Sequence, residues 1–464
     1  MPNQLPIALL NALEKLDHFD REAFCTIHEA GIQEVSVHMN VDKLSLSGDK
    51  WPDQISNPPF EISGKVPWAE EAYYLSARPS FTMDPLFHAG TYYVQEASGM
   101  FLAYAINKTT NISTHLKILD LCAAPGGKST IVQSLISKNS LLVSNEVIKT
   151  RVPVLYQNMT KWGLINGIIS NNDPSHFRKL PGFFDIVIVD APCSGSGLFR
   201  KDPEAALAWS PDSVNVCSHR QQRILGDIWD CLKEDGLLIY STCSYSKEEN
   251  EDIVDMLCKQ YPCESIDLNP DPEWNIIETK SDQSAAFGYR FYPYKLKGEG
   301  FFLSVIRKKQ SAGSVYSSKS SRFQNRLDKK TEIQIKPWIY ENALDFVQIG
   351  DQIHAMPQGM HNDFEILKES LYLKKAGIRL GKPGDKEWIP DHELALSTIL
   401  NNNYPSIDLS EEDALRYLRS ETLEIIQKYK GWHVIRFQKQ RIGWVKLLGN
   451  RINNYYPKSW RIRR

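Results

Sequence analysis

Two cysteines stand where covalent chemistry is feasible. Cys193 lies in the segment DAPCSGSG, three residues after Asp190, and Cys243 lies in the segment YSTCSYSKEENE. A thiolate is a strong nucleophile, and a positioned carboxyl group can donate or accept a proton. Each segment follows a short apolar run, residues 186–189 and 236–240, typical of a buried parallel strand. Because such strands present their carboxyl ends at one sheet edge, we expect the three side chains to meet there. The alternatives are a plain strand-to-loop turn for Cys193 and a structural buried thiol for Cys243.

A glycine-rich loop is the second feature that indicates a ligand site. The segment KILDLCAAPGGKST, residues 117–130, joins a predicted strand to a predicted helix that begins near Lys128. Backbone N–H groups and the helix dipole make such a loop a cradle for a nucleotide or cofactor. The loop matches neither GxGxxG nor GxxxxGK[ST], so neither a dinucleotide nor an NTP is indicated. A second predicted strand, residues 141–146, ends at Glu146, and an acid at that place suits ribose hydroxyls.

The elements that must position these groups alternate in type. A third strand, residues 167–170, ends in the polar run 171–173, residues 205–232 are expected to be helical, and residues 298–306 are expected to form the last strand. Acids at residues 248–251 suit the start of a further helix. This alternation predicts a doubly wound, Rossmann-like α/β sheet.

Composition limits the class of protein. With 464 residues the chain is expected to form two or three domains, and its net charge of −2 with 42% hydrophobic residues is typical of a soluble globular protein. The start lacks the features of a signal peptide, and no apolar run is long enough to span a bilayer. Eight cysteines without CxxC pairs argue against a zinc site and a disulfide framework, and favour a reducing cytoplasm.

The regions around this core suggest RNA contacts. The pattern of residues 1–60 predicts a small α+β unit. Residues 67–105 are rich in aromatic side chains, and we expect Tyr92 and Tyr93 to belong to a core and not to a base-stacking surface. Residues 310–330 read as a linker and residues 331–464 as a separate unit. Residues 428–464 hold eleven Lys or Arg and no Asp or Glu. Aromatic residues are interleaved with these cations, among them Trp432, Phe437, Trp444, Tyr455, Tyr456 and Trp460. A basic, aromatic face predicts nucleic-acid binding, and a solvated charged face is the alternative.

The segments LDLCAAPGGKST, DAPCSGSG and YSTCSYSKEENE together resemble the RNA cytosine-5 methyltransferases of the Nop/Sun family. The resemblance extends to GTYYVQEASGM and GEGFFLSVIRKK, and residues 431–461 are similar to the PUA-like tail of bacterial members that modify small-subunit rRNA. The N-terminus lacks room for the helical NusB-like domain of another branch, which favours the PUA-bearing branch. The implied domains are an N-terminal α+β RNA-binding unit (1–105), a class I methyltransferase domain (106–309), a linker (310–330) and a C-terminal RNA-binding region with a PUA-like end (331–464).

The resemblance also implies site residues. Cys243 corresponds to the nucleophile, Cys193 to the cysteine that assists product release, and Asp190 with Lys128 completes the catalytic set. The cofactor implied is S-adenosylmethionine, with its ribose on Glu146 and its adenine near Asp173. The implied cofactor-binding residues are Cys122, Ala123, Ala124, Pro125, Gly126, Gly127, Lys128, Glu146, Arg151, Asp173 and Asp190.

The implied activity is methylation of carbon 5 of a cytosine in RNA, most directly 16S rRNA, through a covalent cysteine–cytosine intermediate. A tRNA substrate and a non-catalytic RNA-binding assembly factor are the alternatives. The implied partner is rRNA or the small ribosomal subunit, and we expect a monomer without a metal or a membrane. Two residues depart from the family pattern: Tyr294 where histidine is frequent, and Ser420 where glycine is usual.

Overall fold

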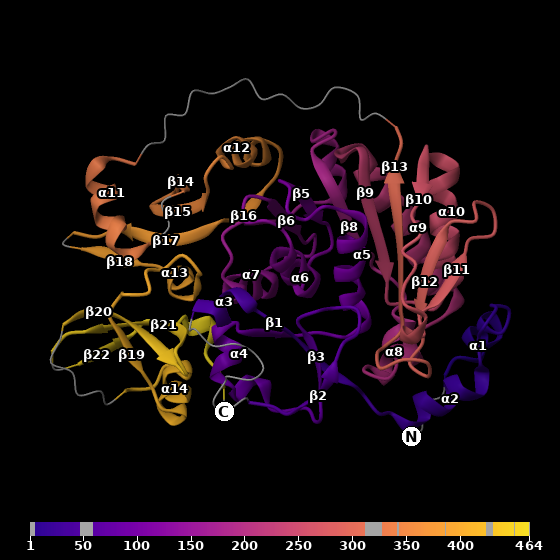
Figure 1. The fold of residues 1–464 in the computed structure, drawn as a ribbon, viewed down its shortest axis with the longest axis horizontal. Helices are drawn as coiled ribbons and strands as arrows, with labels where there is room; N and C mark the ends of the chain where they lie inside the picture. Colours follow the sequence, from indigo (N-terminus) through magenta and orange to yellow (C-terminus); the bar gives the residue numbers. More distant parts are fainter. Residues whose placement is uncertain are drawn as a thin grey trace.

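A computed structural model describes residues 5–46, 59–310, 327–340, 343–385, 387–423, 430–449 and 451–463. Its centre is a large mixed sheet with strand order β11-β12-β13-β9-β8-β5-β6-β7-β16 (Figure 1). The parallel strands are β5 (Lys117–Asp120), β6 (Leu141–Asn145), β7 (Gly167–Ser170), β8 (Phe184–Asp190) and β9 (Leu232–Thr242). The strand order reverses beside β5, so the predicted doubly wound sheet is confirmed.

Antiparallel strands extend both edges of this parallel centre. On the side of β9 the added strands are β13 (Phe301–Lys308), β12 (Phe287–Phe291), β11 (Ile277–Lys280) and, beside β13, β10 (Cys263–Ser265). On the side of β7 the added strand is β16 (Leu373–Ala376), which comes from the C-terminal region.

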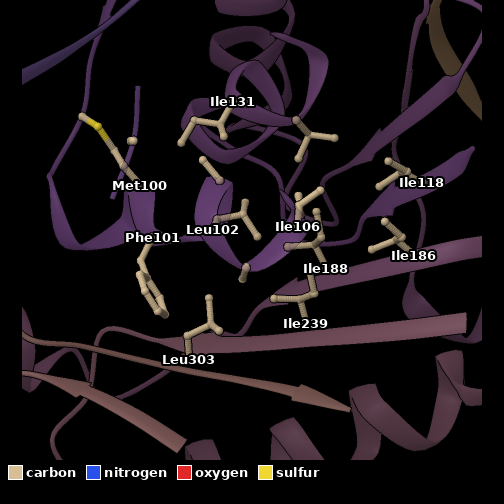
Figure 2. Close-up of a cluster of buried hydrophobic side chains, with 14 of the residues drawn as sticks. Met100, Phe101, Leu102, Ile106, Ile118, Ile131, Ile186, Ile188, Ile239 and Leu303 are labelled. Carbon is tan, nitrogen blue, oxygen red and sulfur yellow. The ribbon is translucent and has the colours of Figure 1, made fainter. Parts of the chain in front are cut away.

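Both faces of the central strands are buried, which explains their continuous apolar runs. Along β8, Ile186 and Ile188 face one hydrophobic cluster, whereas Val187 and Val189 face another. All four side chains are at most 1% exposed. Figure 2 shows the first cluster, where helix α5 (Phe101–Thr109) packs its apolar face on Ile188 and Ile239. A sheet covered on two sides needs no polar alternation along its strands.

Helices connect and cover the strands. They are α6 (Gly127–Leu135), α7 (Val152–Trp162), α8 (Pro203–Ala208), α9 (Pro211–Ile228) and α10 (Glu251–Gln260). The single helix expected over residues 205–232 is therefore two helices, because Ser210 is extended and forms a capping box with Ser213 at the start of α9. The residue before a proline avoids helical geometry, and Pro211 follows Ser210 directly.

The N-terminal residues form short helices and a four-stranded antiparallel sheet of order β2-β3-β1-β4. The elements are α1 (Ile7–Leu13), α2 (Arg21–Ala30), β1 (Val35–Met39), α3 (Val41–Leu46), β2 (Ile62–Lys65), β3 (Ala72–Leu75), α4 (Pro85–Ala89) and β4 (Tyr92–Val94). Tyr92 is a core residue, as expected, whereas Tyr93 is only half-buried and its ring lies beside Gly127 of the glycine loop.

Two more sheets lie in the C-terminal region. The first contains β14 (Leu344–Ile349), β15 (Gln352–Pro357), β17 (Ile378–Pro383) and β18 (Trp388–Pro390), and the second contains β19 (Ser406–Asp408), β20 (Gly431–Phe437), β21 (Gln440–Leu447) and β22 (Ile452–Asn454). The accompanying helices are α11 (Lys329–Ile335), α12 (His361–Ser370), α13 (His392–Leu396) and α14 (Glu411–Leu418).

The C-terminal region is not the separate unit that its sequence suggested. Strand β16 pairs with β7, and α12 contributes Phe364 and Leu367 to the hydrophobic cluster behind the central sheet. Side chains of β20 and β21 share another cluster with the N-terminal sheet, and Figure 1 shows these yellow strands beside the N-terminal elements. Most of the expected linker, residues 311–326, lies outside the described residues.

The expected aromatic surface is also corrected. Trp432, Phe437, Trp444 and Tyr456 are between 1% and 8% exposed, because they pack inside the C-terminal sheets. Only Tyr455, at 40%, is well exposed among the six. Proximity to lysine and arginine in the sequence does not distinguish stacking rings from core rings, because residues 432–435 of β20 and 442–445 of β21 are all buried and both faces of these strands are therefore covered. Among the described helices, none is both long and apolar enough to cross a membrane.

Candidate catalytic and cofactor site

The two cysteines meet at the carboxyl ends of neighbouring strands. Strands β8 and β9 pair in parallel with Asp190 opposite Ser241, so the loops that follow start side by side. The Sγ atoms of Cys193 and Cys243 are 3.2 Å apart, and both side chains are half-buried. The expectation that Asp190, Cys193 and Cys243 share one sheet edge is confirmed.

The two thiols are not equivalent. The hydrogen bond with Cys243 and the loss of water on burial raise the pKa of Cys193 well above its ordinary value. Either sulfur can donate in this hydrogen bond, and the raised pKa of Cys193 favours Cys193 as the donor. A sulfur that accepts such a bond is better able to carry negative charge, which is the form in which a thiol attacks.

Glu249 fixes both cysteine loops. Its buried carboxylate accepts hydrogen bonds from the backbone N–H of Ser194 at 2.7 Å and from the Ser194 hydroxyl at 2.6 Å. The same carboxylate accepts a hydrogen bond from the hydroxyl of Ser244, directly after Cys243. Glu249 thus joins the residues that follow each thiol. The sequence analysis assigned Glu249 only to a helix start, and no local pattern reveals a contact made across two loops.

Asp190 forms an ion pair with Lys128 on the cofactor side of the sheet. Asp190 Oδ2 lies 2.7 Å from Lys128 Nζ, and Asp190 Oδ1 accepts a hydrogen bond from the Ser241 hydroxyl at 2.9 Å. Burial alone would favour the neutral amine, but Asp190 and neighbouring acids outweigh it and raise the pKa of Lys128. The ammonium also lies 5.2 Å from the ring centroid of Phe301. Lys128 therefore stays charged and holds one oxygen of Asp190 in place.

The loop between β5 and α6 forms a cradle of backbone groups. Gly126 has a φ of +117°, a conformation that favours glycine, and a Cβ atom on Gly127 would lie 3.1–3.2 Å from Gln95 and Tyr93. Both glycines therefore keep the turn tight and leave the backbone bare at the start of α6. The predicted residues Cys122, Ala123, Ala124, Pro125 and Lys128 lie in or beside this turn. The Cys122 thiol is inert, because burial raises its pKa.

Glu146 lies at the end of β6, facing this cradle across Arg151. Its Oε1 atom accepts a hydrogen bond from the backbone N–H of Ile148 at 2.8 Å. Its Oε2 atom is buried, has no hydrogen bond within the described residues, and lies 3.3 Å from Arg151 Nη1. Arg151 also donates to the carbonyl of Ala124. A buried carboxylate oxygen without a hydrogen bond is suited to accept one from a ribose hydroxyl.

Asp173 follows β7 and lies at the third polar strand end. Its Oδ1 atom accepts hydrogen bonds from the backbone N–H and the hydroxyl of Ser175, and these bonds hold the pKa of Asp173 below its usual value. Its Oδ2 atom lies 3.7 Å from Arg223. The side chain is 37% exposed, so it is accessible to an adenine edge.

Asp120 belongs to the site although the sequence analysis treated it only as part of a strand. It is fully buried at the end of β5, and its Oδ2 atom accepts a hydrogen bond from the Ser129 hydroxyl at 2.6 Å. Burial raises the pKa of Asp120 to about 7. The sequence does contain an indication of this role, because Asp120 is an acid within an apolar strand directly before a glycine loop. Burying a charged group is costly, so a buried acid usually has a specific partner or function.

Comparison with known proteins gives three matching family models. They are 16S rRNA methyltransferase RsmB/F over residues 108–307, the N-terminal domain of 16S rRNA methyltransferase RsmF over residues 5–97, and the methyltransferase RsmF PUA domain over residues 404–462. The first model contains the cysteine pair and the cofactor cradle, and the other two match the flanking regions.

Individual relatives extend over most of the chain. The chain is 28% identical over 439 residues to ribosomal RNA small subunit methyltransferase F of Psychromonas ingrahamii, covering 91% of this chain and 90% of the relative. It is 27% identical over 441 residues to the protein of the same name from Escherichia coli, covering 91% and 89%. A solved structure of a methyltransferase homologue from Pyrococcus horikoshii is 27% identical, with a TM-score of 0.52 over 66% of this chain and all of that chain.

Proposed function

Because this chain belongs to the 16S rRNA methyltransferase RsmB/F family, we propose that it methylates carbon 5 of a cytosine in small-subunit rRNA, using S-adenosylmethionine. The observation that carries the proposal is the cysteine pair, with its two sulfur atoms 3.2 Å apart beside Asp190. Carbon 5 of cytosine is a poor nucleophile until a thiolate has added to carbon 6, so an activated cysteine is what this reaction requires.

The residues of the glycine loop fit the proposed cofactor. The bare backbone at Gly126 and Gly127 accommodates a close ligand, and the Glu146 oxygen that lacks a hydrogen bond accepts one from the ribose. Asp173 provides an exposed acceptor for the adenine amino group, and Asp190 lies beside the same loop through its contact with Lys128. When bound, S-adenosylmethionine supplies an electrophilic methyl group.

Each catalytic residue has a distinct role in the proposed reaction. Cys243 adds to carbon 6 as a thiolate, with the Cys193 sulfur 3.2 Å from its own. Asp190, in its acid form, donates a hydrogen bond to ring N3 and stabilises the negative charge that develops on addition, while Lys128 orients Asp190. After methylation a base takes the carbon-5 proton, the ring double bond re-forms, and Cys243 leaves as a thiolate. The short distance between the sulfurs supports a role for Cys193 in this release step.

The units around the methyltransferase sheet are proposed to hold the RNA. The target base must leave its stack to reach Cys243, so contacts on both sides of it are needed. We assign these contacts to residues 1–105 and 331–464, the latter with a PUA-like end. A monomer that acts on rRNA or on the small ribosomal subunit in the bacterial cytoplasm is the corresponding proposal for partners and location.

The decisive experiment separates the two cysteines by their covalent products. Full-length protein is incubated with small-subunit rRNA and radiolabelled S-adenosylmethionine, and adducts are resolved on denaturing gels. Cys243→Ala should transfer no methyl group and form no adduct, whereas Cys193→Ala should methylate once and remain bound to the RNA. Cys25→Ala, on helix α2, is the control and should behave as wild type.

The opposite pattern would reverse the two roles. An adduct with Cys243→Ala and none with Cys193→Ala would make Cys193 the attacking thiol. Wild-type methylation by both variants would refute the covalent mechanism altogether.

A further inference from the structure

A polar cavity of about 200 Å³ lies away from the two cysteines, where the N-terminal helix α3 meets the C-terminal sheets. Helix α3, the segment after α13, and strands β20 and β21 contribute its walls. Four cationic side chains line it, and among the described residues that line it there is no Asp or Glu: the cations are Lys43, Arg436, Lys439 and Arg441. The lining is therefore cationic in a protein whose net charge is −2.

Arg441 is the cation most in need of a ligand. It donates to the carbonyl oxygens of Ser397 at 3.1 Å and Leu400 at 3.0 Å, and to the side-chain oxygen of Asn402. These bonds occupy three of its five N–H groups. Arg441 forms no ion pair within the ranges that the structure describes, and burial lowers its pKa to about 10. Arg441 is half-buried, and a partly desolvated guanidinium without a counter-charge is costly, so an anion at this place would stabilise the folded protein.

Lys43 strengthens the same field. It is 5% exposed, and its ammonium donates to the backbone carbonyls of Ala89 and Lys161, which carry no net charge. Burial first, and then the positive charge of Arg441, hold the pKa of Lys43 well below its usual value. The charges of buried Lys43 and half-buried Arg441 thus repel each other. In contrast, Arg436 is paired with Asp408 at 2.6 Å and is already neutralised.

The remaining lining suits an oxyanion. Ser406, Asn401 and Asn402 add polar side chains, and Tyr404 adds a hydroxyl. An apolar ligand would leave the charge of Arg441 uncompensated, whereas a phosphate offers several acceptor oxygens to guanidinium and hydroxyl donors.

We propose that this cavity binds a phosphate group of the RNA substrate, with Arg441 as its principal ligand. The proposal rests on the proposed RNA substrate and adds an anchoring point built jointly by the N-terminal helix α3 and the C-terminal strands β20 and β21. The cavity is built from elements other than β8 and β9, which carry the cysteines. It therefore holds the RNA at a place separate from the reacting base. It therefore contributes to RNA affinity and not to the chemical step.

The test measures binding of a fluorescent small-subunit rRNA fragment to full-length protein by anisotropy over a series of salt concentrations, without S-adenosylmethionine. Arg441→Gln should weaken binding roughly tenfold or more and reduce the log–log salt slope by about 0.7–0.9, the share of one phosphate contact. Arg441→Lys keeps the charge and should retain the slope. Lys259→Gln, which removes an exposed cation from α10, is the control and should change neither quantity.

A second variant guards against misfolding of Arg441→Gln. Ser406→Asp places an internal anion in the lining and should weaken RNA binding in the same way, with its fold checked by circular dichroism. Equal slopes and affinities for wild type, Arg441→Gln and Ser406→Asp would overturn the proposal. If wild type itself fails to bind the RNA, the proposed substrate is refuted instead, so the two failures are distinguishable.

Competition with inorganic phosphate distinguishes an RNA phosphate from free phosphate as the ligand of the cavity. At matched ionic strength, phosphate should compete with RNA for wild type but not for Arg441→Gln. A rise in Tm with phosphate that depends on Arg441, without any effect of Arg441→Gln on RNA binding, would overturn the assignment to RNA and make free phosphate the ligand.

Discussion

Glu249→Ala is expected to disable catalysis without touching a reacting atom. The Glu249 carboxylate is fully buried and accepts three short hydrogen bonds, two from Ser194 and one from Ser244, besides a long one from Gln221 at 3.5 Å. Each charge-assisted bond contributes about 1.5–3 kcal/mol, or roughly 5–9 kcal/mol in total. Burying the carboxylate costs several kcal/mol of this, and burial accordingly raises its pKa. We expect a net loss of about 2–3 kcal/mol in the free energy of unfolding.

The effect on the reaction should exceed the effect on stability. Without Glu249 the loops that follow Cys193 and Cys243 lose their common anchor, and a shift of about 1 Å at reacting atoms can cost on the order of 100-fold in rate. We expect kcat to fall by about that factor while the affinity for S-adenosylmethionine stays unchanged, because Glu249 does not contact the glycine loop. Single-turnover methylation and urea denaturation measure the two quantities.

Glu248→Ala is the matched control, since it removes the same charge from an exposed neighbour in the same helical turn. It should leave kcat and stability within a factor of about two and about 0.5 kcal/mol of wild type. Equal kcat and equal adduct yield for Glu249→Ala and Glu248→Ala would show that the anchor is dispensable, and the reasoning would fail.

Three other perturbations test separate parts of the structure. Glu146→Ala should weaken S-adenosylmethionine binding by about 1.5–3 kcal/mol in calorimetry, and unchanged affinity would remove Glu146 from the site. Joint replacement of the exposed Lys458, Arg461 and Arg463 by glutamine should lower the RNA salt slope by about 2, and an unchanged slope would exclude this tail from the RNA contact. Asp120 has its pKa raised to about 7, so the folded state holds a proton that the unfolded state releases above about pH 4. Wild type should therefore lose up to about 4 kcal/mol of unfolding free energy between pH 4 and 7 relative to Asp120→Asn, and parallel stability curves would contradict this.

The sequence was sufficient to predict the positions of the side chains that directly follow the parallel strands. The apolar runs of β5, β6, β7, β8 and β9 identify parallel strands, and parallel neighbours bring their carboxyl ends together. The meeting of Cys193 and Cys243 follows from that rule alone. The positions of these groups are thus fixed by local pattern and by one topological regularity.

The sequence was insufficient where partners are distant or where loops meet. The strand Leu373–Ala376 is four residues long, and nothing in those residues names β7 as its partner. Glu249 bonds Ser194 across 55 residues, a contact that depends on the final packing of two loops. Residues that depart from the family pattern also become clear only in three dimensions. Ser420 has a φ of +61°, a left-handed conformation that favours glycine.

The pairing of β16 with β7 has a consequence for how the protein is made. Strand β7 ends at Ser170, and its partner ends at Ala376, about 200 residues later. At typical synthesis rates of about 5–20 residues per second, the apolar edge Gly167–Ser170 waits about 10–40 s for its cover. An uncovered strand edge is a template for pairing with other chains. Newly made copies are therefore most vulnerable to aggregation during this interval, and a nascent chain halted before residue 373 would keep that open edge.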